Sequence, residues 1–189
     1  GTIIHWGKDC YWDFFDSKKT KKNLLLALKT QTTGQSLTTA KRIIAPMEKS
    51  SYIDKGQKIG VKYKFDLEGE VEFTRYVINI AHKKQLTVDE SAFRELDDLV
   101  SKGFEASLEE NERYFAKAYD SSDIEIVGDD EDQQGIRYCL FQLEQAYHGY
   151  QNDNNIGAKG LTGEAYSGHA FWDSETYCLP FFLFTNQEA

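Results

Sequence analysis

The hydrophobic pattern of this 189-residue chain changes its period at Gln85, and this change constrains the fold more than any other feature. Before Gln85, apolar and polar side chains tend to alternate, which is typical of antiparallel strands with one solvated face. A hairpin-like break at Gly34-Gln35 separates the first two of these runs. Four strands are few for a closed sandwich, so we expect partners from residues 1–20 or from outside the chain. The predicted strands are 23–33, 36–45, 59–66 and 70–82.

After Gln85 the apolar residues recur at helical spacing. Thr87–Glu90 has the sequence of a capping box, and Gly103 is a plausible helix stop. A second capping box, Ser107–Glu110, predicts the start of another helix. We therefore predict two short helices in series, which form a helical linker over residues 85–122.

A third helix is predicted over Gln133–His148, with the acidic run Asp129–Asp132 placed where it complements the helix dipole. Its apolar stripe is wide, so we expect the helix to be covered on most sides. Arg137 on this helix needs a partner, and the candidates are Glu125, Asp129 or an acidic residue outside the chain. The stripes of this helix and of the helices before it are expected to need partners that the chain does not contain.

Charge and cysteine content exclude several classes of function. The net charge is −9, yet residues 1–84 carry 16 Lys/Arg against 9 Asp/Glu, whereas residues 85–189 carry 6 against 22. The lysines of the basic half are scattered along strands without a recognition motif, so we expect no nucleic-acid partner. Cys10, Cys139 and Cys178 lack metal-ligand spacing, which predicts reduced thiols and no metal site.

The remaining features of composition concern location. No apolar run has the length of a membrane helix, and no signal peptide is evident, so we expect a cytoplasmic protein without a membrane partner. The chain begins at Gly1 within a run of ordinary sequence. We therefore expect it to be a fragment of a longer protein.

The candidate functional stretch is KGLTGEAYSGHAFWDSETYCLPFFLF, Lys159–Phe184. A carboxylate beside aromatic rings suits a sugar, because the rings cover its apolar face and the carboxylate accepts two hydroxyl hydrogen bonds. Trp172 and Asp173 are placed in this way. The alternative is that Asp173 caps a helix beginning at Ser174. For Phe171 and His169 the alternative is core packing, and for Lys159 it is a solvated surface position.

Residues 123–143 (DIEIVGDDEDQQGIRYCLFQL) and 157–186 (GAKGLTGEAYSGHAFWDSETYCLPFFLFTN) resemble glycoside hydrolase family 65. This is the family of maltose, trehalose, kojibiose, nigerose and glucosylglycerol phosphorylases. The resemblance is strong over 123–186 and weak before about residue 87. The family commonly has a His and two Trp where this chain has Asn111, Phe115 and Tyr119, and some members have Arg in place of Lys159.

The resemblance implies an α+β fold in which part of an antiparallel β-sandwich precedes linker helices and the first helices of an (α/α)6 barrel. The implied divisions are 1–84 for the sandwich portion, 85–122 for the linker and 123–189 for the start of the catalytic domain. The chain is too short to form the whole barrel.

The resemblance also implies a function, which is inverting phosphorolysis of an α-glucoside to β-glucose 1-phosphate. Inorganic phosphate is the co-substrate, no cofactor is implied, and the full-length protein is expected to be a homodimer. Trp172 and Asp173 would line the glucosyl subsite, with Phe171, His169 and Lys159 as further substrate-binding candidates. The general acid Glu is expected downstream, so no catalytic residue is expected in this chain. The alternatives are a family hydrolase of α-glucosides and a non-catalytic carbohydrate-binding or assembly fragment.

Overall fold

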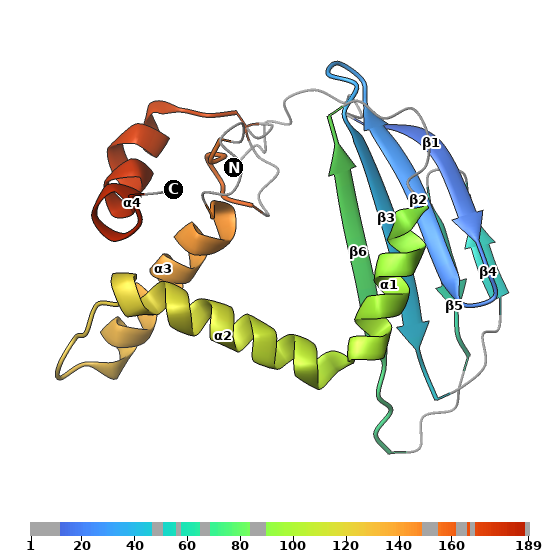
Figure 1. Ribbon diagram of the computed structural model, residues 1–189, viewed down its shortest axis with the longest axis horizontal. Coiled ribbons are helices and arrows are strands. Elements are labelled where there is room, and N and C mark those ends of the chain that lie inside the picture. The colour runs from blue at the N-terminus through green and yellow to red at the C-terminus, as the bar shows by residue number, and fades with distance from the viewer. Residues whose placement is uncertain are drawn as a thin grey trace, which may run out of the picture. The chain divides into compact units, whose positions relative to one another are not determined.

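The chain divides into two compact units, whose described residues lie before and after the boundary between Leu108 and Glu109. The computed structural model describes residues 12–46, 51–55, 58–64, 69–83, 90–148, 155–161, 166 and 169–187. Figure 1 labels the strands and the α-helices of the two units. The first unit contains antiparallel sheet and one complete helix, and the second is helical, so the predicted α+β class is confirmed.

The first unit is built on a four-stranded antiparallel sheet. Its spatial order is β1 (Trp12–Lys19), β2 (Asn23–Thr30), β3 (Ser36–Ile44) and β6 (Thr74–His82). A separate two-stranded sheet pairs β4 (Ser51–Asp54) with β5 (Ile59–Lys62). The β2–β3 hairpin turns at Gly34, whose φ of 69° lies in the left-handed region that glycine adopts without steric cost.

The strand predictions are mostly confirmed, with shorter boundaries. β1 supplies the partner expected from residues 1–20, and β2 and β3 match their predicted runs. β5 ends at Lys62, before the predicted end at residue 66, and β6 begins at Thr74, after the predicted start at residue 70. The alternating sequence patterns are therefore longer than the hydrogen-bonded strands. β4 was not predicted, because a strand of only four exposed residues gives no alternation to read.

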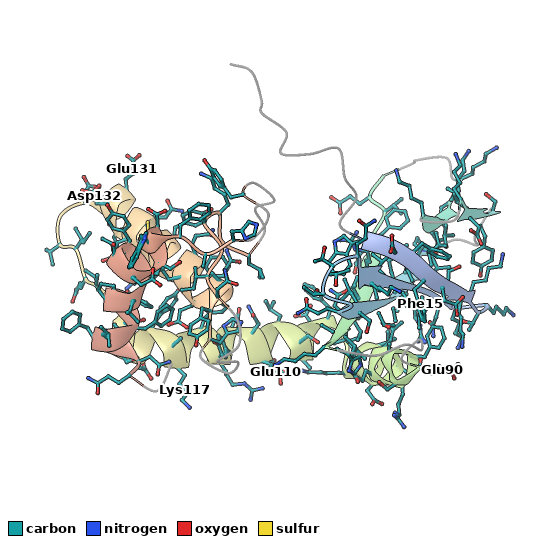
Figure 2. All side chains as sticks on the ribbon, turned by 90° about the horizontal axis from the view of Figure 1, so that it is seen from above. Phe15, Glu90, Glu110, Lys117, Glu131 and Asp132 are labelled. Carbon is teal, nitrogen blue, oxygen red and sulfur yellow. The ribbon has the colours of Figure 1, made fainter. Side chains whose placement is uncertain are left out.

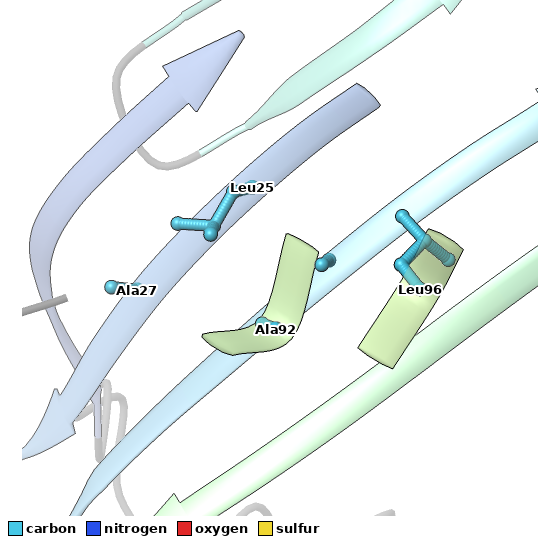
Figure 3. Close-up of a cluster of buried hydrophobic side chains, with 5 residues drawn as sticks. Leu25, Ala27, Ala92 and Leu96 are labelled. Atoms are coloured by element: carbon cyan, nitrogen blue, oxygen red, sulfur yellow. The ribbon is translucent and has the colours of Figure 1, made fainter. Parts of the chain in front are cut away.

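The core of the first unit lies between the sheet and α1 (Ser91–Lys102), which packs against β3 and β6. Figure 1 shows α1 lying across the face of the sheet. Ala92 and Leu96 of α1 are fully buried in one cluster with three residues of the sheet, and Figure 3 shows this cluster. The sheet residues are Leu25, Ala27 and Ala40. The expectation that this helix needs a partner outside the chain is therefore wrong.

Two ion pairs link α1 and its N-terminal flank to the strands. Lys18 of β1 pairs with Glu90, and Arg42 of β3 pairs with Asp97. Arg42 also donates from Nε to the side-chain oxygen of Asn23 at 2.7 Å. These contacts hold α1 against the sheet through polar groups at the margin of the buried cluster.

The break between α1 and α2 (Phe104–Ser122) falls at Gly103, as predicted. Gly103 has φ 86° and ψ 171°, and its N–H donates to the carbonyl of Leu99. The prediction that Ser107 caps the second helix is wrong, because α2 begins directly after the glycine. Ser107 lies inside the helix, and its hydroxyl donates to the Gly103 carbonyl at 2.7 Å. Thr87 of the first capping box lies outside the described residues, and Glu90 makes no capping hydrogen bond.

The second unit contains α3 (Asp130–Ala146), which begins three residues before the predicted start. Asp129 caps it by accepting hydrogen bonds from the backbone N–H groups of Glu131 and Asp132 at 2.9 and 3.1 Å. Figure 2 labels both acidic residues at this end of the unit, and their side chains are exposed. An aspartate at this position is favoured because it satisfies free N–H groups of the first turn.

An aromatic contact joins α3 to α2. Phe141 packs on Phe115 of α2 with ring centroids 5.1 Å apart, and Phe115 also contacts Tyr119. Tyr138 is 61% exposed and Cys139 is also exposed. The prediction that α3 is covered on most sides is therefore wrong for this chain.

No helix among the described residues is both long enough and apolar enough to cross a membrane.

Candidate functional site

The candidate site lies at the start of the last helical segment of the second unit. A π-helical turn, η2 (Ser174–Cys178), leads directly into α4 (Leu179–Thr185). The N–H of Leu179 donates to the carbonyl of Ser174, five residues earlier. Pro180 explains the local widening, because proline has no N–H and its ring crowds the carbonyl four residues before it. Turns of this kind are frequent at functional sites.

Asp173 stands immediately before η2, but it does not cap the helix. Its backbone is already helical, with φ −56° and ψ −35°, and its side chain accepts no capping hydrogen bond. The N–H of Ser174 donates instead to the backbone carbonyl of Phe171 at 3.0 Å. The capping interpretation of Asp173 is therefore wrong, and its exposed carboxylate remains available to a ligand.

Aromatic residues stand close to Asp173 in the sequence, and their side chains are exposed. Trp172 is 84% exposed, and Tyr177 and Phe171 are also among the exposed large side chains. Burial of the nearby Cys178 raises the pKa of its thiol, and the negative charge of Asp173 raises it further. Cys178 is therefore held as a neutral thiol beside the carboxylate. Exposed rings next to a carboxylate are groups that can cover an apolar ligand face and accept hydrogen bonds beside it.

A loop preceding the helix carries the other predicted site residues. Its start is tied to η2 by Ser174, whose hydroxyl donates to the carbonyl of Ile156 at 3.1 Å. Further along, Lys159 places its Nζ 5.5 Å from the ring centroid of Tyr166. The ring of Tyr166 also meets Phe171 edge to face, with centroids 5.5 Å apart. The backbone N–H of His169 donates to the carbonyl of Tyr166 at 3.0 Å.

The structure thus brings three of the five predicted substrate-binding residues to Tyr166, two of them to its ring and His169 to its backbone carbonyl. Lys159, His169 and Phe171 all contact Tyr166. Among the described residues, the side chains of Trp172 and Asp173 make no ring contact or hydrogen bond with these three. Sequence reasoning missed Tyr166, because no sequence pattern marks a tyrosine as a contact shared by several neighbouring residues.

A second feature of this unit is the ion pair between Arg137 and Asp123. The guanidinium donates from Nε to Oδ1 at 3.0 Å and from a terminal nitrogen to Oδ2 at 2.6 Å. Within the chain, the hydrogen-bonded partner of Arg137 is Asp123, so the candidates Glu125 and Asp129 are wrong for that role. The hydrogen bond from Arg137 lowers the pKa of the Asp123 carboxyl below its ordinary value. The pair anchors the segment before α3 to the helix that follows it.

An open cavity of about 490 Å³ lies beside this ion pair. Two of its polar lining residues are engaged, Arg137 in the ion pair and Gln133 through its side-chain amide, whose oxygen accepts from the Ile126 N–H and whose nitrogen donates to the Ile124 carbonyl. The cavity contains none of the predicted site residues. It is lined by Tyr119, Asp130, Gln133, Gln134, Arg137, Tyr138 and Phe141.

Comparison with known families places the candidate site in a catalytic domain. Residues 137–189 match the glycosyl hydrolase family 65 central catalytic domain. The chain is 40% identical to an alpha,alpha-trehalose phosphorylase of Thermoanaerobacter brockii, over 68% of this chain and 17% of that protein. It is 46% identical to a maltose phosphorylase of Bacillus subtilis strain 168, over 48% of this chain and 12% of that protein.

A solved structure is similar to nearly the whole chain. A protein from the human microbiome assigned as a kojibiose phosphorylase superposes with a TM-score of 0.82 and 46% identity. The match covers 99% of this chain and 25% of that one. The chain belongs to glycosyl hydrolase family 65. It spans less than a fifth of the length of these two curated relatives.

Proposed function

We propose that this chain is the part of an α-glucoside phosphorylase that carries the beginning of its donor-sugar subsite. The observation that carries the proposal is the carboxylate of Asp173, which is exposed and makes no capping hydrogen bond beside the exposed ring of Trp172. The similarity to trehalose, maltose and kojibiose phosphorylases supports the choice of reaction.

The two residues have complementary roles in holding a glucosyl unit. The carboxylate of Asp173 accepts hydrogen bonds from two sugar hydroxyls, and such charge-assisted bonds are stronger than neutral ones. Trp172 covers the adjacent apolar face of the sugar ring. Phe171 and His169 extend the same wall, and Lys159 donates to an acceptor hydroxyl.

The chemistry requires one proton donor outside this chain. A general acid protonates the leaving oxygen while inorganic phosphate attacks the anomeric carbon from the opposite face. An α-glucoside therefore gives β-glucose 1-phosphate and a free acceptor sugar. Phosphate is already an anion, so no second carboxylate has to activate it, in contrast to the paired carboxylates of inverting hydrolases. The chain itself supplies binding groups, no cofactor, and no catalytic residue.

The fold supports a matching division of the parent protein. Residues 1–84 form part of a β-sandwich, 85–122 a helical linker, and 123–189 the beginning of an (α/α)6 barrel. The order of elements supports this division, since sheet precedes the two helices in series and the helical unit follows. We place the parent in the cytoplasm as a homodimer without nucleic-acid or membrane partners, and size-exclusion chromatography with light scattering tests the dimer.

The reaction is tested with the full-length protein that contains this chain. It is incubated with maltose, trehalose, kojibiose and nigerose, with and without phosphate. We expect glucose 1-phosphate from at least one disaccharide, only when phosphate is present. Release of free glucose without phosphate would instead establish the hydrolase alternative.

The isolated 189 residues distinguish the remaining alternative. We expect the isolated chain to show no phosphorolysis, because the proton donor lies elsewhere. Saturable sugar binding by the isolated chain, together with an inactive full-length protein, would favour a carbohydrate-binding or assembly role. Phosphorolysis by the isolated chain would contradict the assignment of the general acid to a downstream segment.

A further inference from the structure

We propose that Tyr166 is a positioning residue of the donor-sugar subsite, an inference that rests on the proposed function. Its ring holds Lys159 and Phe171, and its backbone carbonyl holds His169. Tyr166 therefore acts through its neighbours and sets where their side chains stand when the sugar arrives.

The ring of Tyr166 makes two different kinds of contact. The ammonium of Lys159 lies 5.5 Å from the ring centroid, within the range in which the negative face of an aromatic ring attracts a cation. Phe171 meets the same ring at an interplanar angle of 73°, which is the favoured edge-to-face arrangement. One side chain thus fixes a cation and an aromatic wall that are twelve residues apart in the sequence.

The backbone of Tyr166 indicates that its side chain is needed where it stands. Its φ is 64°, and it is the one described residue other than glycine with a positive φ. Glycine and asparagine adopt this conformation with less strain than a bulky aromatic residue does. Such a conformation persists when surrounding contacts determine it, and the three contacts of Tyr166 are of that kind.

The consequence for the reaction is a specific change in substrate binding. A lysine held over a ring keeps its ammonium in one region while its N–H groups remain free to donate outward. Without the ring, Lys159 samples many rotamers and must be ordered by the substrate. Loss of the ring should therefore raise KM for the disaccharide more than it lowers kcat.

Three variants of the full-length protein separate the ring from the backbone. Tyr166→Phe keeps the ring, whereas Tyr166→Gly removes it and suits the positive φ better than tyrosine does. We expect phosphorolysis by Tyr166→Phe to stay within about twofold of wild type, and Tyr166→Gly to lose about tenfold in kcat/KM, mainly through KM. In a Lys159→Met background, the added effect of Tyr166→Gly should shrink to about twofold or less.

A measurement independent of activity tests the contact itself. Isotope-labelled methyl groups are placed on the lysines by reductive methylation, and the Lys159 signal is assigned through Lys159→Arg. Ring currents should shift this signal in wild type and Tyr166→Phe, and the shift should vanish in Tyr166→Gly. An active wild-type enzyme with an undiminished Tyr166→Gly variant overturns the inference, as does a Tyr166→Phe variant as damaged as Tyr166→Gly.

Failure of the proposed function gives a different result. A wild-type protein without phosphate-dependent activity removes the subsite role of Tyr166 together with the reaction. The methyl signal of Lys159 then shows whether the ring contact exists without that role.

Discussion

Leu96→Ala gives the sharpest test of how α1 is joined to the sheet. Leu96 has no exposed surface and belongs to the cluster that also contains Leu25. Removing about three carbons loses about 2.4 kcal/mol of transfer free energy at ~0.8 kcal/mol per buried carbon. Apart from Leu25, the other buried cluster members are alanines, Ala27, Ala40 and Ala92, which are too short to fill the space, and the larger, partly buried side chains around them would have to shift to fill it. A cavity therefore remains, and we expect a total loss of about 3–4 kcal/mol.

The assay is urea denaturation of the 189-residue chain followed by far-ultraviolet circular dichroism. The shift in midpoint at an unchanged slope gives the change in the free energy of unfolding. Leu108→Ala is the matched control, because Leu108 is 41% exposed and should cost less than about 1 kcal/mol. If Leu96→Ala costs no more than Leu108→Ala, α1 is not packed on the sheet as described.

Three further predictions concern the helices. Gly103→Ala should destabilise the chain by about 1–3 kcal/mol because its φ of 86° and ψ of 171° suit glycine almost exclusively. Gly135→Ala, in the open interior of α3, should stabilise it by about 0.5–1 kcal/mol, and thermal melts measure both. Burial raises the pKa of the Glu144 carboxyl, so the charged form destabilises the fold. Glu144→Gln should therefore stabilise the chain at neutral pH. The gain should fade as pH falls through the raised pKa of the folded state towards 4.5, and below 4.5 it should be absent because the wild-type carboxyl is protonated in both states. The Asp123–Arg137 pair should show favourable coupling in a double-mutant cycle of denaturation midpoints, which is lost as pH falls below 3.8 because Asp123 has a lowered pKa.

Each of these predictions has a result that would contradict it. A shift of the melting temperature in the same direction by both alanine variants would contradict the roles given to Gly103 and Gly135. Glu112→Gln, at an exposed position of α2, is the control for Glu144 and should leave the pH profile unchanged. A Glu144→Gln variant that gains as much stability in acid as at neutral pH would show that the charge of Glu144 is not the source of the gain. A coupling between Asp123 and Arg137 that persists unchanged in acid would exclude the ion pair as its source.

The sequence predicted features that depend on local chemistry. Gly34 and Gly103 marked the hairpin and the helix break correctly, because a positive φ is a property of the residue and its immediate neighbours. Asp129 ahead of α3 likewise gave the helix start to within a few residues. The period change at Gln85 separated sheet from helix for the same reason, since side-chain periodicity follows backbone geometry.

The sequence could not predict features that depend on which segments meet. Ser107 has the sequence of a cap, yet it lies inside α2 because the break at Gly103 takes precedence. Asp173 is a favoured cap residue, but its helical backbone leaves the carboxylate without that role. The partner of Arg137 and the contacts of Tyr166 come from three-dimensional packing, and neither leaves a periodic signal.

Replacement of Asp173 tests the central claim most directly. The measurement is kcat/KM for phosphorolysis by the full-length protein, using the disaccharide it cleaves best. Asp173→Ala removes two charge-assisted hydrogen bonds to the sugar, so the account predicts a loss of at least about 100-fold. Glu175→Gln, an exposed neighbour on the same helical turn, should stay within about twofold. An Asp173→Ala variant as active as Glu175→Gln would contradict the placement of the donor sugar against this residue.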